Sequence, residues 1–171
     1  MARNYPFGDD MCRSFAESLK SVDPGHSPIE LALRHALQIV FMGLKSQAWH
    51  IDQRDCLTLT EIEKIVAAEE LVGMLVFSQA IIAPYRVDFL VALNPGDGRK
   101  SAFVAVECDG HEWHERTKEQ AAKDKKRDRR LQEQGIAVLR VTGSEVWKSP
   151  VACAHEIAAN LSGIALNRFV P

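Results

Sequence analysis

The chain has 171 residues, of which 46% are hydrophobic and 26% are charged, and its formal net charge is −2. This composition is typical of a folded globular domain and excludes a disordered or collagen-like chain. A chain of this length can bury about 70% of its unfolded surface, so a core forms without disulfides or metal ions. The net charge excludes a globally basic nucleic-acid binder, so any contact with nucleic acid has to come from a local patch.

The cysteines and the first residues indicate a cytoplasmic protein. The four cysteines, at positions 12, 56, 108 and 153, form no C-x-x-C pair, and we expect them to be reduced thiols. The first residues, MARNYPFGDD, lack a basic segment followed by an apolar one, so we expect no secretion signal. The longest apolar stretch, around residues 72–77, is far shorter than the ~20 residues that cross a bilayer, so we expect no membrane partner.

Helical patterns dominate the first part of the chain. Residues 9–21 predict a short helix. The segment Ser27-Pro28-Ile29-Glu30 combines an N-cap serine, a first-turn proline and an acid, and the apolar spacing that follows predicts a helix over 29–47. Another helical pattern opens at Thr60-Glu61-Ile62-Glu63 and runs to about residue 70.

The pattern changes to that of strands in the middle of the chain. Residues 72–82, 85–93 and 102–109 are apolar with a β-branched and aromatic bias, which predicts three strands. The turn-rich segment NPGDGRKS joins the last two as a hairpin. The expected remainder is a charged helix over 115–134, a strand over 136–142 and a helix over 144–162. This order predicts a single α/β domain over 1–171, with a mixed central sheet of about four strands flanked by helices.

An aspartate lies inside the predicted strand 85–93, where Asp is rare and costly to bury. Strict alternation places Val87 and Phe89 on one face of this strand, and Asp88 on the other face with Leu90. A hairpin register that pairs Asp88 with Glu107 centres the turn in the middle of NPGDGRKS. Directly opposed side chains lie ~5 Å apart, so we expect these two carboxylates to meet.

The next strand adds a third acid to the same place. Glu107 and Asp109 are two residues apart and therefore share a face, while Cys108 points the opposite way. Carboxylates held close together call for a cation, and hard oxygen ligands favour Mg²⁺ or Mn²⁺ over zinc. The alternative is that the acids pair with Arg86, Arg140 or the basic helix.

A zinc site is a second alternative at this position. Its ligands would be Cys108, His111 and His114. Cys108 faces away from the acids, and no fourth Cys or His lies near in sequence. The histidines are otherwise exposed or capping residues.

The helix after the acids carries the opposite charge. Residues 116–130, RTKEQAAKDKKRDRR, contain eight Lys or Arg and three acids. Such a patch neutralises phosphates and positions a nucleic-acid backbone without reading its sequence, although a charged helix face is also commonly just solvated. Five residues nevertheless share one stripe at helical spacing, which indicates polar groups turned toward the sheet: Gln120, Asp124, Arg127, Asp128 and Leu131.

The run from residue 79 to 147, containing YRVDFLVAL, AFVAVECDGHEWHE and KDKKRDRRLQEQGIAVLRV, resembles the PD-(D/E)XK nuclease superfamily. It is similar in particular to the small Vsr-like branch, related to very-short-patch repair endonucleases, whose members carry D-F…E-x-D-G…R-D…L…G…V-L-R. The resemblance implies a restriction-endonuclease-like core over 28–148, an N-terminal extension over 1–27, and a C-terminal helix and tail over 149–171.

The resemblance also implies a function and a set of site residues. The expected activity is a metal-dependent endonuclease that hydrolyses DNA with a metal-activated water, with Mg²⁺ or Mn²⁺ as cofactor and RNA as the alternative substrate. The expected catalytic residues are Asp88, Glu107 and Asp109, with His114 moving a proton. The expected metal ligands are Asp88, Glu107, Asp109 and Glu30, and the expected nucleic-acid-binding residues are Lys118, Lys126, Arg127 and Arg129.

The sequence departs from the superfamily pattern at one position. The lysine of the usual E-x-K motif is replaced by Asp109. In an active enzyme the cationic role therefore moves to Lys118, Lys126 or Arg127. The alternative function is a catalytically inactive DNA-binding or partner-binding module on the same fold. No feature of the sequence indicates an oligomeric state.

Overall fold

The structure is a computed structural model that describes residues 6–19, 27–43, 49–51, 58–67, 72–96, 98–109 and 118–167, with only the backbone at 42, 43, 49–51, 118 and 167. The helices are α1 (Pro6–Leu19), α2 (Pro28–Gly43), α3 (Leu59–Val66), α4 (Lys118–Glu133), α5 (Gly143–Lys148) and α6 (Pro150–Asn167). The strands are β1 (Trp49–Ile51), β2 (Gly73–Ser78), β3 (Ile81–Ile82), β4 (Tyr85–Arg86), β5 (Phe89–Asn94), β6 (Ala102–Asp109) and β7 (Ile136–Thr142).

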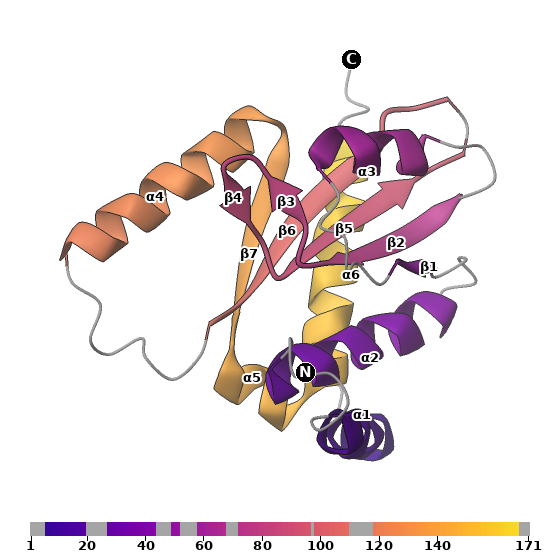
Figure 1. The fold of residues 1–171 in the computed structure, drawn as a ribbon. Coiled ribbons are helices and arrows are strands. Elements are labelled where there is room, and N and C mark those ends of the chain that lie inside the picture. Colours follow the sequence, from indigo (N-terminus) through magenta and orange to yellow (C-terminus); the bar gives the residue numbers. More distant parts are fainter. Residues whose placement is uncertain are drawn as a thin grey trace.

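A mixed sheet forms the centre of the fold (Figure 1). Its strand order is β1-β2-β5-β6-β7. Strand β5 is antiparallel to both of its neighbours, β2 and β6, whereas the outer pairs β1–β2 and β6–β7 are parallel. Strands β3 and β4 form a separate small hairpin. The predicted α/β class with a mixed, helix-flanked sheet is confirmed, and β1 adds an edge strand to the four expected.

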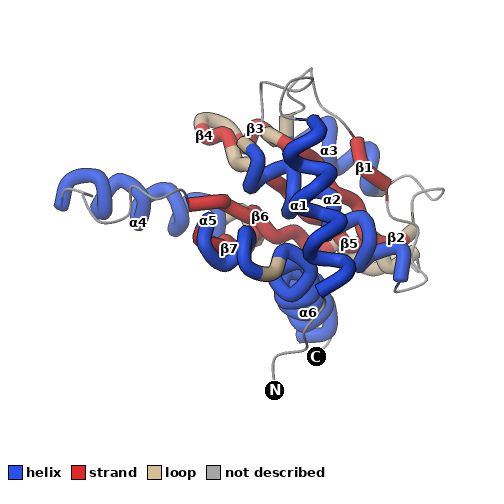
Figure 2. Tube along the Cα trace, turned by 90° about the horizontal axis from the view of Figure 1, so that it is seen from below, coloured by secondary structure: helices blue, strands red, loops and turns tan. Residues whose placement is uncertain are grey.

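Two layers of helices cover the two faces of this sheet. One core cluster joins α1, α2, α5 and α6 to one face, through residues such as Phe41, Phe89 and Ile157. The second cluster joins α3 and α4 to the opposite face, where Ile62 and Leu131 are fully buried. Figure 2 shows α4 extending to the side of the molecule, beside β7. No described helix is long and apolar enough to cross a membrane.

Two of the predicted strands are interrupted in the structure. The predicted strand 72–82 breaks at Gln79, whose φ of 55° directs the chain away from β2 and into the β3–β4 hairpin. The predicted strand 85–93 breaks between β4 and β5 at Val87 and Asp88. The face assignment made from strict alternation is therefore wrong for Val87, which packs with Leu90 in one cluster while Phe89 packs in the other. Alternation holds only while a residue stays in the extended conformation of a paired strand.

The predicted helix 144–162 is also two helices. The chain breaks at Ser149, because Pro150 has no N–H to donate and restricts the residue before it. The new helix start is capped from a distant part of the chain, since the buried Asp9 of α1 accepts hydrogen bonds from the Val151 N–H at 3.0 Å and the Ser149 hydroxyl at 2.9 Å. The predicted strand 136–142 is confirmed at both ends.

The burial of Leu131 generates a test of the packing of α4. We expect Leu131→Ala to lower the free energy of unfolding by about 3 kcal/mol, because the truncation leaves a cavity between α4 and the sheet. Leu166→Ala is the matched control, since Leu166 is 66% exposed, and its cost should stay within about 0.5 kcal/mol. Urea unfolding measures both values, and equal losses would contradict the packing described.

Candidate active site

The pairing of β5 with β6 brings Asp88 to Glu107. Phe89 lies opposite Val106 and Leu93 lies opposite Ala102, which is the register predicted from the sequence. Asp88 precedes β5 and is half-buried, and its Oδ2 accepts a hydrogen bond from the backbone N–H of Cys108 at 2.8 Å. The carboxylate of Asp88 is thereby held at the end of β6, next to the position of Glu107.

Glu107 and Asp109 lie on the sheet face covered by α4. Cys108 packs on the opposite face, against the cluster that contains α2 and α6, so the predicted alternation along β6 is confirmed. Glu107 is 9% exposed and Asp109 is 8% exposed. Burial of this degree is rare for carboxylates without charged partners.

The carboxylates of Asp88, Glu107 and Asp109 repel one another in a part of the protein that is largely shielded from water. Burial raises the pKa of Asp88, and the negative charge of Asp109 raises it further, against the opposing effects of the Cys108 N–H and Arg127. Burial also raises the pKa of Glu107 to about 7, with a further contribution from the charge of Asp88. Both carboxyl groups therefore favour a cation next to them.

Arg127 of α4 supplies that cation. Its guanidinium donates a hydrogen bond to Glu107 Oε1 and forms a salt bridge with it. The same group donates to the backbone oxygen of Arg86 at 2.8 Å and lies 5.9 Å from the centre of the Tyr85 ring. The stripe predicted from the sequence to face the sheet contains Arg127 as its one cation, although Lys118 and Lys126 were also candidates for the role of the missing lysine. The structure directs Arg127 to the acids.

A second arginine joins Asp109 to α4. Arg140 of β7 lies 3.6 Å from Asp109 Oδ1, and it donates to Asp128 Oδ1 at 2.8 Å. Part of the alternative considered from the sequence is thus present, because the acids of β6 do form ion pairs with Arg140 and the basic helix. Asp128 was expected on the inward stripe of α4, and this bond places it there.

Glu30 is linked to Asp88 through a residue that sequence reasoning missed. The Gln79 side chain donates to Glu30 Oε2 at 2.9 Å, and the Gln79 backbone N–H donates to the Asp88 carbonyl at 2.7 Å. The other oxygen of Glu30 accepts from the Ser27 hydroxyl at 3.0 Å, as part of the cap of α2. These two bonds fix the orientation of the Glu30 carboxylate and leave a lone pair on each of its oxygens. The sequence did carry a signal for Gln79, because it is a polar residue within the apolar run 72–82.

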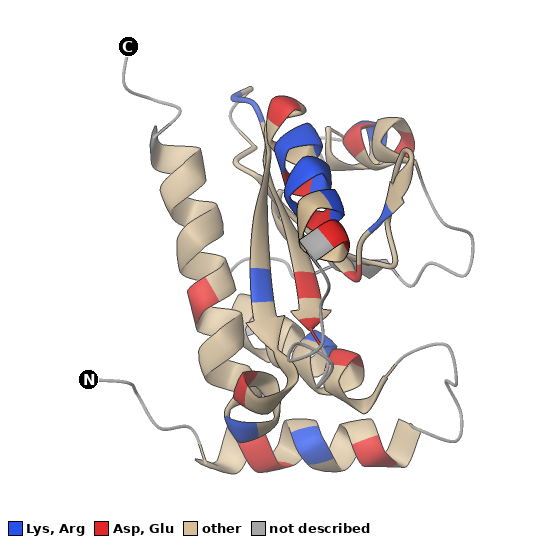
Figure 3. Ribbon diagram, turned by 90° about the vertical axis from the view of Figure 1, so that its left-hand side faces the viewer, with Lys and Arg blue, Asp and Glu red and all other residues tan. Residues whose placement is uncertain are grey.

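The exposed cations predicted to bind nucleic acid lie along α4. Lys126 and Arg129 are exposed, and Figure 3 shows Lys and Arg residues gathered along this helix. His111 and His114 lie outside the described residues, as does the side chain of Lys118. The zinc alternative, which needs both histidines, is therefore outside the described part as well.

The donor atoms at Asp88 and Glu107 suit a hard divalent ion. Across the described parts of the chain, no group of three or more His, Cys, Asp or Glu side chains is arranged to hold a metal. Mg²⁺, however, is usually bound by only one or two protein carboxylates with water and phosphate as the other ligands. Asp88 and Glu107 supply two carboxylates at neighbouring positions, and the guanidinium of Arg127 stands against Glu107 as a positive charge.

The raised pKa of Glu107 predicts how stability depends on pH in the metal-free protein. The folded state holds the Glu107 proton up to about pH 7, whereas the unfolded chain releases it near 4.5. This contribution to stability is present below pH 4.5 and is lost as the pH rises through 7. Glu107→Gln cannot titrate, so we expect wild type to lose on the order of 3 kcal/mol relative to this variant between pH 4.5 and 7.5.

Urea unfolding in EDTA across this pH range measures the difference. Glu17→Gln is the matched control, because it makes the same chemical change at an exposed position of α1. We expect this control to follow wild type. Parallel curves for wild type and Glu107→Gln would show that burial does not hold a proton on Glu107.

Comparison with known proteins identifies the family. Residues 62–161, more than half of the chain, match the model of a restriction-endonuclease-like family described as REase_MTES_1575. No curated protein and no solved structure matches the chain. The matched region contains Asp88, Glu107, Asp109, Arg127 and Arg140, together with the strands that position them. The chain therefore belongs to the restriction-endonuclease-like family REase_MTES_1575.

Proposed function

We propose that this protein is a metal-dependent endonuclease that hydrolyses phosphodiester bonds of DNA. Membership of a restriction-endonuclease-like family supplies the nuclease class. The observation that carries the finer proposal is the neighbouring position of Asp88 and Glu107 at the end of the β5–β6 pair, with Arg127 against Glu107. The pattern of the Vsr-like branch supports a further assignment to that branch, within the same superfamily.

Asp88 and Glu107 would hold Mg²⁺ or Mn²⁺, with Asp109 next to them. When bound, such an ion lowers the pKa of a coordinated water and neutralises charge on the phosphate. The carboxyl groups contribute by becoming fully ionised, since a nearby cation favours the charged form against burial. Asp109 remains oriented by Arg140, which also contacts Asp128 of α4.

Arg127 takes the place of the missing E-x-K lysine in this proposal. It is the one of the three candidate cations whose described side chain contacts a site carboxylate. With a metal ion held by Glu107, the guanidinium of Arg127 would be available to a phosphate, whose oxygens suit its planar group of donors. His114 follows β6 by five residues in sequence and remains our candidate for proton transfer.

Lys126 and Arg129 would hold the nucleic-acid backbone, and Lys118 would extend this contact. They are exposed or at the start of α4, on the helix whose Arg127 contacts the acids. Contacts of this kind are to phosphates and carry no sequence information. Membership of a restriction-endonuclease-like family makes DNA the proposed substrate, with RNA as the alternative.

The inactive binding module is the second candidate function. The pairing of Glu107 with Arg127 favours it, because an ion pair at this position satisfies the carboxylate without a metal. A module of this kind would retain DNA with no divalent ion present. The two functions differ in turnover and in their need for metal.

A plasmid-nicking assay decides between them. With Mg²⁺ or Mn²⁺, we expect Asp88→Asn and Glu107→Gln to lower the nicking rate at least about a hundredfold, because each removes a ligand charge. Asp10→Asn, at a position whose side chain is 75% exposed, should nick like wild type, and EDTA should stop both wild type and this control. Wild type that cleaves neither DNA nor RNA with either ion would leave only the binding module.

The contribution of α4 to binding is measured by salt dependence. We expect Lys126→Ser/Arg129→Ser to reduce the slope of log K against log salt by about 1.8, since each lost phosphate contact removes about 0.9. Lys148→Ser removes an exposed charge from α5 instead and should leave the slope as in wild type. An unchanged slope in the double variant would show that the nucleic-acid backbone does not contact Lys126 and Arg129.

A further inference from the structure

The β3–β4 hairpin lies next to the acids, and the proposed function gives it no role. The hairpin leaves the sheet after β2 and returns to it at Asp88 (Figure 1). Its base is closed by two hydrogen bonds, from the Gln79 N–H to the Asp88 carbonyl at 2.7 Å and from the Val87 N–H to the Ala80 carbonyl at 2.9 Å. Val87 is buried in the same cluster as Leu131 of α4. The hairpin is therefore anchored on the sheet face that α4 covers, and it ends at a carboxylate of the candidate site.

Arg127 joins this hairpin to the acids. Its Nη2 donates to the backbone oxygen of Arg86 at 2.8 Å and also to Glu107 Oε1. The backbone of Arg86 and the carboxylate of Glu107 are thus both within hydrogen-bond reach of one nitrogen. Arg86 of β4 is therefore held beside the candidate site, on an element other than α4.

The side chain of Arg86 is a cation at this site that pairs with none of the acids. Among the described residues, the salt bridges to the acids of β6 come from Arg127 and Arg140, and the Arg86 guanidinium takes part in no salt bridge or hydrogen bond. The Arg86 side chain is exposed. Burial raises the pKa of Asp88, and the positive charge of Arg86 is one of the effects that oppose this shift, so the two groups lie within electrostatic range.

An exposed guanidinium beside carboxylates suits a phosphate of the substrate. The acids of the site repel the phosphates that flank a scissile bond, and nucleic-acid-binding proteins neutralise such phosphates with Lys or Arg. Arg127 and Arg140 are committed to carboxylates in this structure. The donors of Arg86 remain available, and their planar arrangement matches phosphate oxygens.

The position of Arg86 in the chain limits which phosphate it can reach. Arg86 and Asp88 are two residues apart, so their Cα atoms are separated by at most about 7 Å. Successive phosphates of one DNA strand rise ~3.4 Å along the helix axis. With the scissile phosphate at Asp88, a phosphate one or two nucleotides away therefore lies within reach of the Arg86 side chain.

We propose that Arg86 binds a phosphate of the substrate strand one or two nucleotides from the cleaved bond. The nucleic-acid backbone is then held by two elements, the β3–β4 hairpin and α4. Arg127 contacts the hairpin from α4 and fixes their separation at the site. This inference rests on the proposed nuclease function and adds to it a substrate-binding residue outside the basic helix.

Binding of a fluorescein-labelled 20-bp DNA duplex, followed by anisotropy in EDTA at several salt concentrations, tests this contact without catalysis. We expect Arg86→Gln to reduce the slope of log K against log salt by about 0.9, the value for one phosphate. The same loss raises Kd about eightfold at about 0.1 M salt, and less as salt increases. Arg86→Lys retains the charge, so its slope should stay close to that of wild type.

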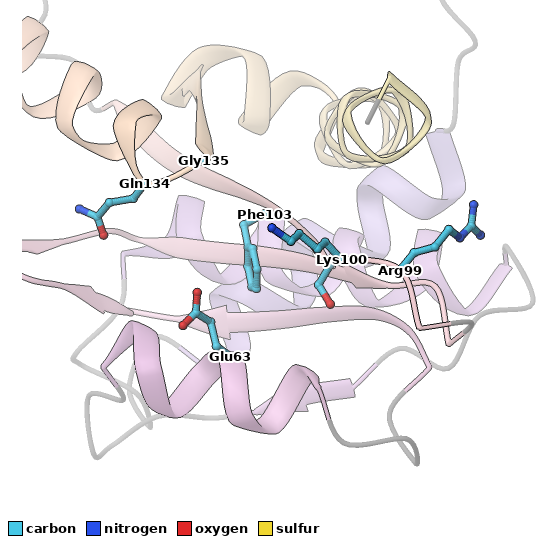
Figure 4. A pocket seen from close by; sticks show the side chains of 7 residues that line it. Glu63, Arg99, Lys100, Phe103, Gln134 and Gly135 are labelled. Atoms are coloured by element: carbon cyan, nitrogen blue, oxygen red, sulfur yellow. The ribbon is translucent and has the colours of Figure 1, made fainter. Parts of the chain in front are cut away.

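Arg99→Gln is the matched control, because it makes the same change at an exposed arginine before the start of β6. Figure 4 shows Arg99 pointing away from Phe103 at a cavity that is also lined by Glu63 and Gln134. This cavity lies at the end of β6 opposite to the acids. We expect the slope and the Kd of this control to match those of wild type.

Three results would overturn the proposal. The first is a wild-type slope in Arg86→Gln. The second is an equal loss of slope in Arg99→Gln, which would mean that any exposed arginine has this effect. The third is an equal loss in Arg86→Lys, which would mean that the charge at this position does not make the contact. Arg86 is exposed, and the conservative lysine variant keeps the test decisive if Arg86→Gln does not fold.

A cleavage assay separates this inference from the proposed function. Arg86→Gln should lower kcat/KM about eightfold at about 0.1 M salt, mainly through KM, in line with its change in Kd. Asp88→Asn should lose cleavage and keep the wild-type slope in binding. Asp88-dependent cleavage with a wild-type slope in Arg86→Gln would reject the Arg86 contact alone, whereas absent cleavage with a reduced slope would reject the endonuclease alone.

Discussion

Because β5 pairs with β6 in the register Phe89–Val106, the carboxylate of Asp88 reaches the backbone of Cys108 and lies beside Glu107. This pairing is between central strands, with β2 and β7 on either side. A shift of one residue would turn Glu107 and Asp109 into the opposite core and bring Cys108 to the site. The hydrophobic packing of two sheet faces therefore protects the arrangement of the acids.

Placing acids at the end of a buried strand creates an electrostatic cost that α4 offsets. Arg127 offsets part of the cost of burying Glu107, and Arg140 of β7 lies between Asp109 and Asp128 of α4. Leu131, one turn after Arg127, is the apolar contact that holds this part of α4 to the sheet. Packing and charge are thus coupled on a single helix face, while the other face of α4 carries exposed cations such as Lys126 and Arg129.

The face of the sheet under α3 and α4 carries polar chemistry at both of its ends. Glu107 and Asp109 lie at the end of β6, and Lys100 and Arg99 lie just before its start. The buried residues between them, Phe103 and Ala105, belong to one continuous cluster. This buried stretch therefore separates the cationic end of the face from its acidic end.

Local pattern was sufficient for much of this fold and part of the site. Alternation along β6 predicted that Glu107 and Asp109 share a face opposite Cys108, because period-2 geometry needs no knowledge of neighbours. The turn-rich loop between β5 and β6 predicted the hairpin register, because a short loop restricts which residues of the two strands can pair. Ser27 and Glu30 predicted the start of α2, which depends only on the first helical turn.

What local pattern missed were features that depend on contacts between distant segments. The breaks at Gln79 and Val87–Asp88 exist because the β3–β4 hairpin leaves the sheet, so alternation misplaced Val87. Helical spacing put Arg127 on the stripe of α4 that faces the sheet, but its contact with Glu107 depends on where α4 packs against β6, which the sequence alone does not give. Residue type and spacing therefore determined which groups could meet, and tertiary packing decided which did, because burial and ion pairing are properties of segments brought together by the whole fold.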